Sequence, residues 1–255
     1  MQCWKVFDPS VQHREMTKEE IAQYTRDFVK GAMVAKRAGF DGVEIHAVHE
    51  GYLLDQFAIA IYNHRTDEYG GSLENRLRIL TDIIQGIHEK CGDNFPISVR
   101  ISVDECLEMC GIPAKGLEFE ETVQMCKVLE TQGVDVLNVS VGMYETVNTV
   151  VEPNSFAEGW RSHLVKAVKE QVSIPVIGNA VIRHPEFAEK LLEEGYQDFI
   201  SMGRTFLAEP EWVKKTEEGR TCEIRKCICC LYCFETVLAA LATGDPIKCA
   251  LNPRT

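Results

Sequence analysis

Short apolar runs rich in β-branched residues alternate along this chain with segments of helical periodicity. Five such runs are predicted as strands, and they lie at residues 41–46, 96–102, 134–140, 174–179 and 198–203. Each run is followed by a segment whose apolar positions recur at helical spacing. Strands that alternate with helices in this way form parallel βα units. The pattern therefore predicts an α/β fold built on a parallel sheet.

Capping residues, glycines and a proline predict where several of the helices begin and end. Thr17 and Glu20 form a T-x-x-E capping box ahead of an apolar stripe, which marks the start of a helix. Two later apolar stripes end at Gly92 and Gly133, because glycine is the usual residue just past a helix. Pro185 opens a further short helix.

Two architectures accommodate five parallel βα units. One is an open Rossmann-like sheet, and the other is a (β/α)₈ barrel that is incomplete here, since five strands cannot close a barrel of eight. A dinucleotide-binding sheet has a glycine-rich turn directly after its first strand. In this chain Ile45 is followed by His46-Ala47-Val48-His49, which weakens the Rossmann alternative.

Composition and charge narrow the class of protein. The chain has 255 residues, of which 45% are apolar and 26% charged, as in one globular domain with a large core. Its formal charge of -12 and its lack of a Lys/Arg-rich run argue against binding to nucleic acid or to anionic membranes. We find neither a basic-then-apolar leader nor a stretch long enough to span a bilayer, so we expect a cytoplasmic protein.

Candidate chemistry follows the first predicted strand. His46 and His49 are three residues apart, and Tyr52 follows them. Chemistry in parallel α/β barrels takes place at the carboxyl ends of the strands, so this cluster is more readily functional than structural. Metal binding is the competing interpretation, but two imidazoles alone are a thin ligand set for zinc.

Two stretches carry a resemblance to a known family. Residues 39–57 resemble the signature of the old yellow enzyme family, and residues 63–76 resemble its N-x-R-x-D-x-Y-G-G-S-x-x-N-R motif. The chain is most similar to the iron–sulfur branch, which includes enoate and enone reductases and amine dehydrogenases. The resemblance implies an incomplete (β/α)₈ barrel at residues 1–218, made of strands four to eight.

The same resemblance implies catalytic roles. His46 and His49 match the pair that hydrogen-bonds the substrate carbonyl oxygen, where donors stabilise the negative charge that develops. Tyr52 matches the tyrosine that protonates the α-carbon. The family usually has His-Gly-Tyr at this point, whereas Glu50 is inserted between His49 and Gly51 in this chain.

Flavin contacts are also implied by the resemblance. Arg100 matches the arginine beside N1 and the C2 carbonyl of FMN. The ends of strands seven and eight match the family's phosphate-binding site, which here comprises Gly178, Asn179, Ala180, Gly203 and Arg204. The family's first three strands, which also contact the flavin, have no counterpart in the sequence. We therefore expect the chain alone to bind FMN weakly.

Cysteines dominate the segment at residues 219–255. Cys227, Cys230, Cys233 and Cys249 form a C-x2-C-x2-C-x15-C pattern. Three closely spaced thiolates with a distant fourth suit a [4Fe-4S] cluster, whereas structural zinc more often uses two separated pairs. Cys229 is a spare that could exchange with a neighbour. The other six of the 11 cysteines are expected to be ordinary thiols: Cys3, Cys91, Cys106, Cys110, Cys126 and Cys222.

The sequence thus predicts an FMN- and [4Fe-4S]-dependent reductase of an activated carbon–carbon double bond in an enone, enoate or enoyl-CoA. The resemblance implies that electrons come from NAD(P)H through an FAD-containing module or partner chain, and the protein could form a homo-oligomer. The alternatives are an amine dehydrogenase of the same family and an inactive truncated fragment.

Overall fold

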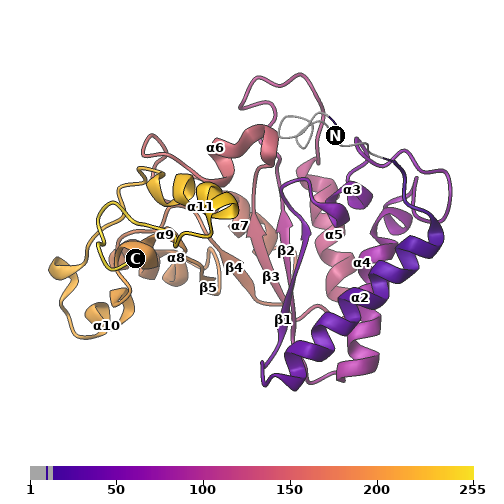
Figure 1. Cartoon of the computed structure of the whole chain (residues 1–255), viewed down its shortest axis with the longest axis horizontal. Coiled ribbons are helices and arrows are strands. Elements are labelled where there is room, and N and C mark those ends of the chain that lie inside the picture. The colour runs from indigo at the N-terminus through magenta and orange to yellow at the C-terminus, as the bar shows by residue number, and fades with distance from the viewer. Residues whose placement is uncertain (1–9, 11–13) are drawn as a thin grey trace.

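A five-stranded parallel sheet organises the molecule (Figure 1). The computed structural model describes residue 10 and residues 14–255, so Cys3 lies outside the described residues. The strands lie side by side in chain order, without the reversal that defines a doubly wound sheet. The prediction of a parallel α/β fold is confirmed, and the Rossmann alternative is wrong. The strands are β1 (Val43–Val48), β2 (Ile97–Ser102), β3 (Val136–Ser140), β4 (Val176–Gly178) and β5 (Phe199–Ile200).

The helices begin and end largely where the local signals predict. The Thr17 hydroxyl accepts from the Glu20 amide, and the Glu20 carboxylate accepts from the Thr17 amide, which completes the capping box. Gly92, with φ of 80°, caps the next long helix. The α-helices are α2 (Lys18–Arg37), α3 (Leu53–Ala58), α4 (Leu73–Cys91), α5 (Phe119–Thr131), α6 (Val147–Val150), α7 (Ser162–Lys169), α8 (Pro185–Glu193), α9 (Arg204–Ala208), α10 (Trp212–Glu217) and α11 (Tyr232–Thr243), and the 3₁₀ helices are η1 (Tyr144–Thr146) and η2 (Thr221–Glu223).

The two faces of the sheet differ in chemistry. One face buries apolar side chains such as Ile45 and Val99 among helices, and α2, α4 and α5 lie together on this side in Figure 1. The opposite face is polar, and there the Glu44 carboxylate accepts 2.9 Å hydrogen bonds from Ser98 and Asn138. A barrel directs such alternate side chains into its interior. This polar face is therefore where the structure places functional groups.

A second, smaller core fixes the carboxyl-terminal part of the chain. It joins α8, α10 and the segment that leads to the cysteines through buried side chains such as Leu191, Trp212 and Ile224. The indole of Trp212 also donates to the Arg183 carbonyl oxygen at 3.2 Å.

Across the part of the chain that the structure describes, no helix combines the length and apolar character needed to cross a membrane.

Close packing of α2 against α4 depends on one glycine. A Cβ atom added to Gly86 would lie 2.6 Å from a γ-methyl group of Val29. Valine is stiff in a helix because its branched side chain has essentially one rotamer there. Gly31 lies in the interior of α2 with nothing within 4 Å of an added Cβ atom.

We expect Gly86→Ala to lower the free energy of unfolding by about 1–3 kcal/mol through overpacking. The matched control Gly31→Ala should raise it by about 0.5–1 kcal/mol, since alanine is the better helix former. Urea denaturation followed by circular dichroism measures both, and Val29→Ala should restore the stability of Gly86→Ala. Equal effects of the two glycine substitutions would contradict this account of the α2–α4 contact.

Candidate active site

A chain of hydrogen bonds links the first strand to the third. Nε2 of His46 lies 2.8 Å from Nδ1 of His49, and Nε2 of His49 lies 2.9 Å from the Ser140 hydroxyl. His46 is exposed, whereas His49 is fully buried. The resemblance implies that the pair hydrogen-bonds the substrate oxygen, and in this arrangement both ring nitrogens of His49 have protein partners. Only His46 faces the open side of the sheet.

A bulge in β1 accounts for the inward direction of His49. His46 pairs with Arg100 and Val48 pairs with Ile101, so Ala47 is an extra residue in the ladder. Bulges re-aim the side chains that follow them. The strand also extends to Val48, so that His46 lies within the strand rather than after it.

Both histidines are neutral in this environment. Burial, together with the nearby Arg100 guanidinium, lowers the pKa of His49 to about 2. The same two causes lower the pKa of His46 below its usual value. A neutral imidazole keeps one N–H group, so His46 can act as a hydrogen-bond donor without carrying charge.

The inserted Glu50 is accommodated by backbone conformation. Glu50 and Gly51 have φ values of 65° and 86°, so both residues occupy the left-handed region. Tyr52 then precedes α3, and its ring contacts His46 edge-on with centroids 5.1 Å apart. Burial raises the pKa of the Tyr52 phenol above its ordinary value. Tyr52 therefore stays beside the histidines as a protonated phenol.

Three donor groups at this point lie close enough to hold a single metal ion. They belong to His46, His49 and Glu50, and no other such group was found among the described residues. The Glu50 carboxylate lies 3.4 Å from Nδ1 of His49. The hydrogen bonds that join His49 to His46 and to Ser140 already account for this geometry. We therefore interpret the cluster as a site for an organic substrate.

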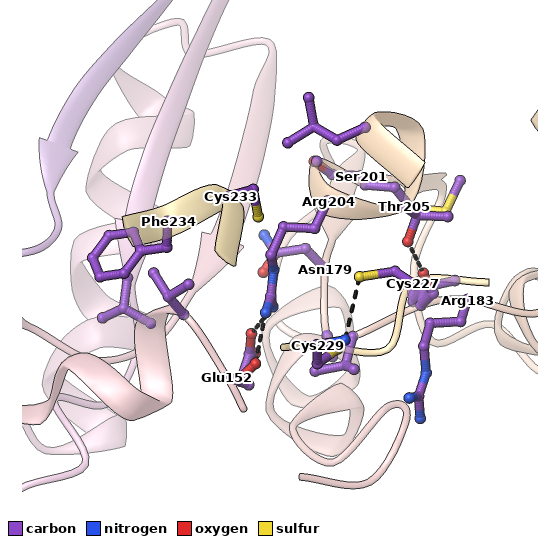
Figure 2. Close-up of a pocket in the computed structure, with 18 of the residues that line it drawn as sticks. Glu152, Asn179, Arg183, Ser201, Arg204, Thr205, Cys227, Cys229, Cys233 and Phe234 are labelled. Carbon is purple, nitrogen blue, oxygen red and sulfur yellow. Dashed lines mark hydrogen bonds and ion pairs between the residues drawn. The ribbon is translucent and has the colours of Figure 1, made fainter. Parts of the chain in front are cut away.

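A cavity of about 380 Å³ lies beside this cluster and is lined by residues from the ends of β2, β4 and β5 (Figure 2). Four arginines and one glutamate line it, in a chain whose net charge is -12. These charged residues are Arg100, Glu152, Arg161, Arg183 and Arg204. An excess of fixed positive charge suits an anionic ligand such as a phosphate ester.

Glu152 organises two of the arginines. Its buried carboxylate lies 2.6 Å from Arg204 and 3.1 Å from Arg161, and it also accepts from the Trp160 indole at 3.1 Å. Arg161 reaches the Asn179 carbonyl oxygen at 2.9 Å. Arg204, which the sequence assigns to the FMN phosphate, is thus held by a carboxylate that the sequence did not indicate.

Two of the arginines have unused donors. The Nε atoms of Arg100 and Arg183 are buried and lack a hydrogen-bond partner in the protein. Buried donors without partners are rare, because each costs free energy. Both line the cavity together with Asn179, Ala180 and Gly203. This donor set fits the phosphate and the electron-rich ring edge of FMN.

Gly178 is the last residue of β4, at the strand end where it is expected, but it is not among the residues that line the cavity. A Cβ atom at this position would lie 2.0 Å from the Gln197 amide oxygen, and Gln197 is held by hydrogen bonds to the carbonyl groups of Gly178 and Phe199. Packing against Gln197 therefore requires glycine at this position.

Five cysteines line a smaller cavity of about 10 Å³. It is lined by the four predicted ligands Cys227, Cys230, Cys233 and Cys249, and by Cys229. The Cys229 amide lies 3.4 Å from the Cys227 sulfur. A hydrogen bond from the Cys229 side chain, with a smaller contribution from its amide, lowers the pKa of the Cys227 thiol below its usual value, which favours the thiolate form that binds metals.

The spacing of these sulfur atoms bears on the kind of centre. Tetrahedral zinc with bonds of about 2.3 Å to sulfur needs its ligand atoms less than 4 Å apart. Among the described residues, no group of three cysteines is close enough to hold a single metal ion. The cysteines therefore lie farther apart than the ligands of one tetrahedral zinc ion.

Sequence reasoning missed four residues of this site. Ser140 ends a predicted strand, and that position alone could have suggested a functional role. Tyr144, Glu152 and Arg161 lie in a segment that has no periodicity and matches no motif. Contacts over long sequence separation place them here, and no local signal shows such contacts.

Comparisons with known proteins agree with this geometry. Residues 5–223 match the model of the NADH:flavin oxidoreductase / NADH oxidase family. An NADH oxidase of Thermoanaerobacter brockii is 49% identical over 242 residues, which cover 95% of this chain and 36% of the relative. A cinnamate reductase of Clostridium sporogenes is 40% identical over 255 residues, which cover 97% of this chain and 38% of the relative.

Solved structures give the same result. A 2-naphthoyl-CoA reductase in complex with 2-naphthoyl-CoA superposes with a TM-score of 0.85 at 32% identity, over 94% of this chain and 35% of the other. Histamine dehydrogenase from Rhizobium sp. 4-9 superposes with a TM-score of 0.84 at 33% identity, over 96% and 34%. The chain thus spans about a third of the length of these relatives. With a family match over residues 5–223, the chain belongs to the NADH:flavin oxidoreductase / NADH oxidase family.

Proposed function

We propose that this chain is part of an FMN-dependent reductase of an activated carbon–carbon double bond, supplied with electrons from NAD(P)H through a [4Fe-4S] cluster. The observation that carries the proposal is a shared wall: Arg204 lines both the arginine-rich cavity and the cysteine cavity. A flavin and a cluster in these two places would be neighbours, as electron transfer between them requires. The names of the cinnamate and 2-naphthoyl-CoA reductases support a conjugated substrate.

FMN, when bound, supplies the hydride for such a reaction. The residues of the chain then have separate tasks. We propose that His46 holds the substrate carbonyl oxygen, with His49 hydrogen-bonded behind it, because a neutral imidazole N–H can stabilise charge that develops on that oxygen. Tyr52 carries the proton for the α-carbon. Together they orient the double bond and complete its reduction.

The cofactor sites divide the chain. We propose residues 1–218 as the FMN-binding part of the barrel, with Arg100 at the ring edge and Arg183, Arg204 and the backbone at Asn179, Ala180 and Gly203 around the phosphate. We propose residues 219–255 as the segment that holds the cluster through Cys227, Cys230, Cys233 and Cys249. An NAD(P)H-oxidising module or partner chain would complete the path of electrons.

Amine oxidation is the second candidate. Histamine dehydrogenase and an N,N-dimethylglycine/sarcosine dehydrogenase of Chromohalobacter salexigens, 34% identical over 226 residues, support it. Amine oxidation releases protons, whereas the site presents Tyr52 as a phenol whose pKa burial raises. A protonated donor suits reduction, so we favour the reductase.

We expect the flavin-loaded protein to reduce a conjugated enone or enoate and to leave a methylated amine unoxidised. Anaerobic absorbance of the flavin during mixing with each compound measures this, because an enone reoxidises reduced flavin and an amine bleaches oxidised flavin. Bleaching by the amine without reoxidation by any enone would establish the second candidate instead.

Substitution of the site residues should separate binding from proton transfer. We expect His46→Ala to weaken binding of a phenolic ligand and to slow flavin reoxidation by enone by about 100- to 1000-fold, since a donor to the developing oxyanion is lost. Tyr52→Phe should keep ligand binding and slow reoxidation by roughly 100-fold or more. Stopped-flow absorbance measures both, with flavin reduction by the electron source as the unchanged control. Intact enone turnover in Tyr52→Phe would rule out the phenol as the donor.

Iron and acid-labile sulfide should co-purify with the protein under anaerobic conditions. We expect Cys230→Ala to abolish both, because a corner ligand of the cluster is removed. Cys222→Ala is the matched control: Cys222 is exposed in η2 and outside the cysteine cavity, so its loss should leave the metal content unchanged. Stoichiometric zinc without sulfide would exclude the cluster.

A further inference from the structure

Two turns on different strands meet above the histidines. One follows β1 and carries Glu50 and Tyr52, and the other follows β3 and carries Met143 and Tyr144. An isolated backbone bridge joins Glu50 to Met143. The phenolic oxygens of the two tyrosines lie 2.7 Å apart, and their rings meet edge-on at 79°. The two hydroxyl groups therefore form a direct hydrogen bond between segments 92 residues apart.

Buried polar contacts hold both turns in place. In the first turn the Gly51 amide donates to the buried Asp55 carboxyl group. In the second the buried Thr146 hydroxyl accepts from the Met143 amide at 2.9 Å and donates to the Glu105 carbonyl oxygen at 2.7 Å. Each turn is fixed independently of the tyrosines. The contact between the phenols is thus a consequence of the fold rather than of two mobile side chains.

After Tyr52 donates its proton, its oxygen needs a hydrogen-bond donor, and the neighbouring side chains differ in whether they can donate. When the phenol gives its proton to carbon, it is left as a phenolate on a side chain that is 36% exposed. His46 contacts the ring, and Glu50, whose pKa burial raises, hydrogen-bonds to Tyr52 and can donate to the phenolate only when it is itself protonated. The Tyr144 hydroxyl can donate to the phenolate, and such charge-assisted hydrogen bonds are about twice as strong as neutral ones.

We propose that Tyr144 is a positioning residue for the proton transfer, which donates to the Tyr52 oxygen as that oxygen loses its proton and then returns a proton to it. The O–H bond of Tyr52 breaks as the C–H bond at the α-carbon forms. The Tyr144 proton then passes to Tyr52, and water reprotonates Tyr144. The inference rests on the proposed function, because it needs a substrate carbon that accepts a proton.

Tyr144→Phe removes only the second hydroxyl group. In stopped-flow reoxidation of the flavin-loaded protein by an enone, we expect it to slow the proton-dependent step by about 10- to 100-fold. Binding of a phenolic ligand should be unchanged. When Tyr144→Phe is added to Tyr52→Phe, the reoxidation rate should fall little further, since the two hydroxyl groups act as one unit. The solvent isotope effect on flavin reoxidation should also change in the single variant Tyr144→Phe.

Tyr62→Phe is the matched control. The Tyr62 hydroxyl donates to the Met143 sulfur at 3.5 Å, so this variant removes a phenolic hydroxyl from a contact with the same turn without removing the contact to Tyr52. It should leave the rate and the isotope effect as in the unmodified protein. A structural role for the turn alone would slow both variants alike, and that outcome would overturn the proposal.

A spectroscopic test does not depend on turnover. With 3-fluorotyrosine at position 52, the fluorine resonance should move in Tyr144→Phe and stay in Tyr62→Phe. An unchanged fluorine resonance in Tyr144→Phe would overturn the inference. If no enone reoxidises the flavin of the unmodified protein, the proposed function is wrong. If the unmodified protein is active and Tyr144→Phe reoxidises its flavin at the same rate, only the inference about Tyr144 is wrong.

Discussion

Parallel register across β1, β2 and β3 is the constraint on which the site depends. It sets His46 opposite Arg100 and Arg100 opposite Asn138, so a proton-bearing imidazole and a fixed cation share one row of the polar face. The bulge at Ala47 then departs from this register by one residue and sends His49 inward to Ser140 on the third strand. A regular ladder aligns the groups, and one irregularity gives the exposed histidine a buried support.

Charge balance around Glu152 follows from the same geometry. A buried carboxylate is costly unless it is paired and hydrogen-bonded, and here it has two arginines and an indole N–H. Arg161, itself buried, neutralises it, so the second arginine, Arg204, remains as net positive charge at the cavity wall. Glu152 therefore orients Arg204 without cancelling the positive charge of the site, which an anionic cofactor needs.

Much of the fold was predictable because its signals are local. The capping box at Thr17 and the glycine at Gly92 act within one turn of helix, and strand alternation shows in a few residues. The ends of parallel strands share one edge, so His46 and Arg100 could be assigned to one site from the sequence. The hydrogen bond of His49 to Ser140 and the role of Glu152 could not, because they join segments 91 and 52 residues apart. The need for glycine at position 178 likewise depends on a distant side chain, that of Gln197.

One short helix relates the two proposed cofactor sites. Helix α9 begins with Arg204, and the end of this segment anchors both flanks of the cysteines. Buried Glu209 accepts from the Arg225 amide at 3.3 Å just before the first ligand, and the Leu207 carbonyl oxygen accepts from Asn252 at 2.9 Å just after the last. Both flanks of the cysteine segment are thus hydrogen-bonded to the segment that begins with Arg204. The spacing between the two proposed cofactor sites is consequently set by these part-buried polar contacts.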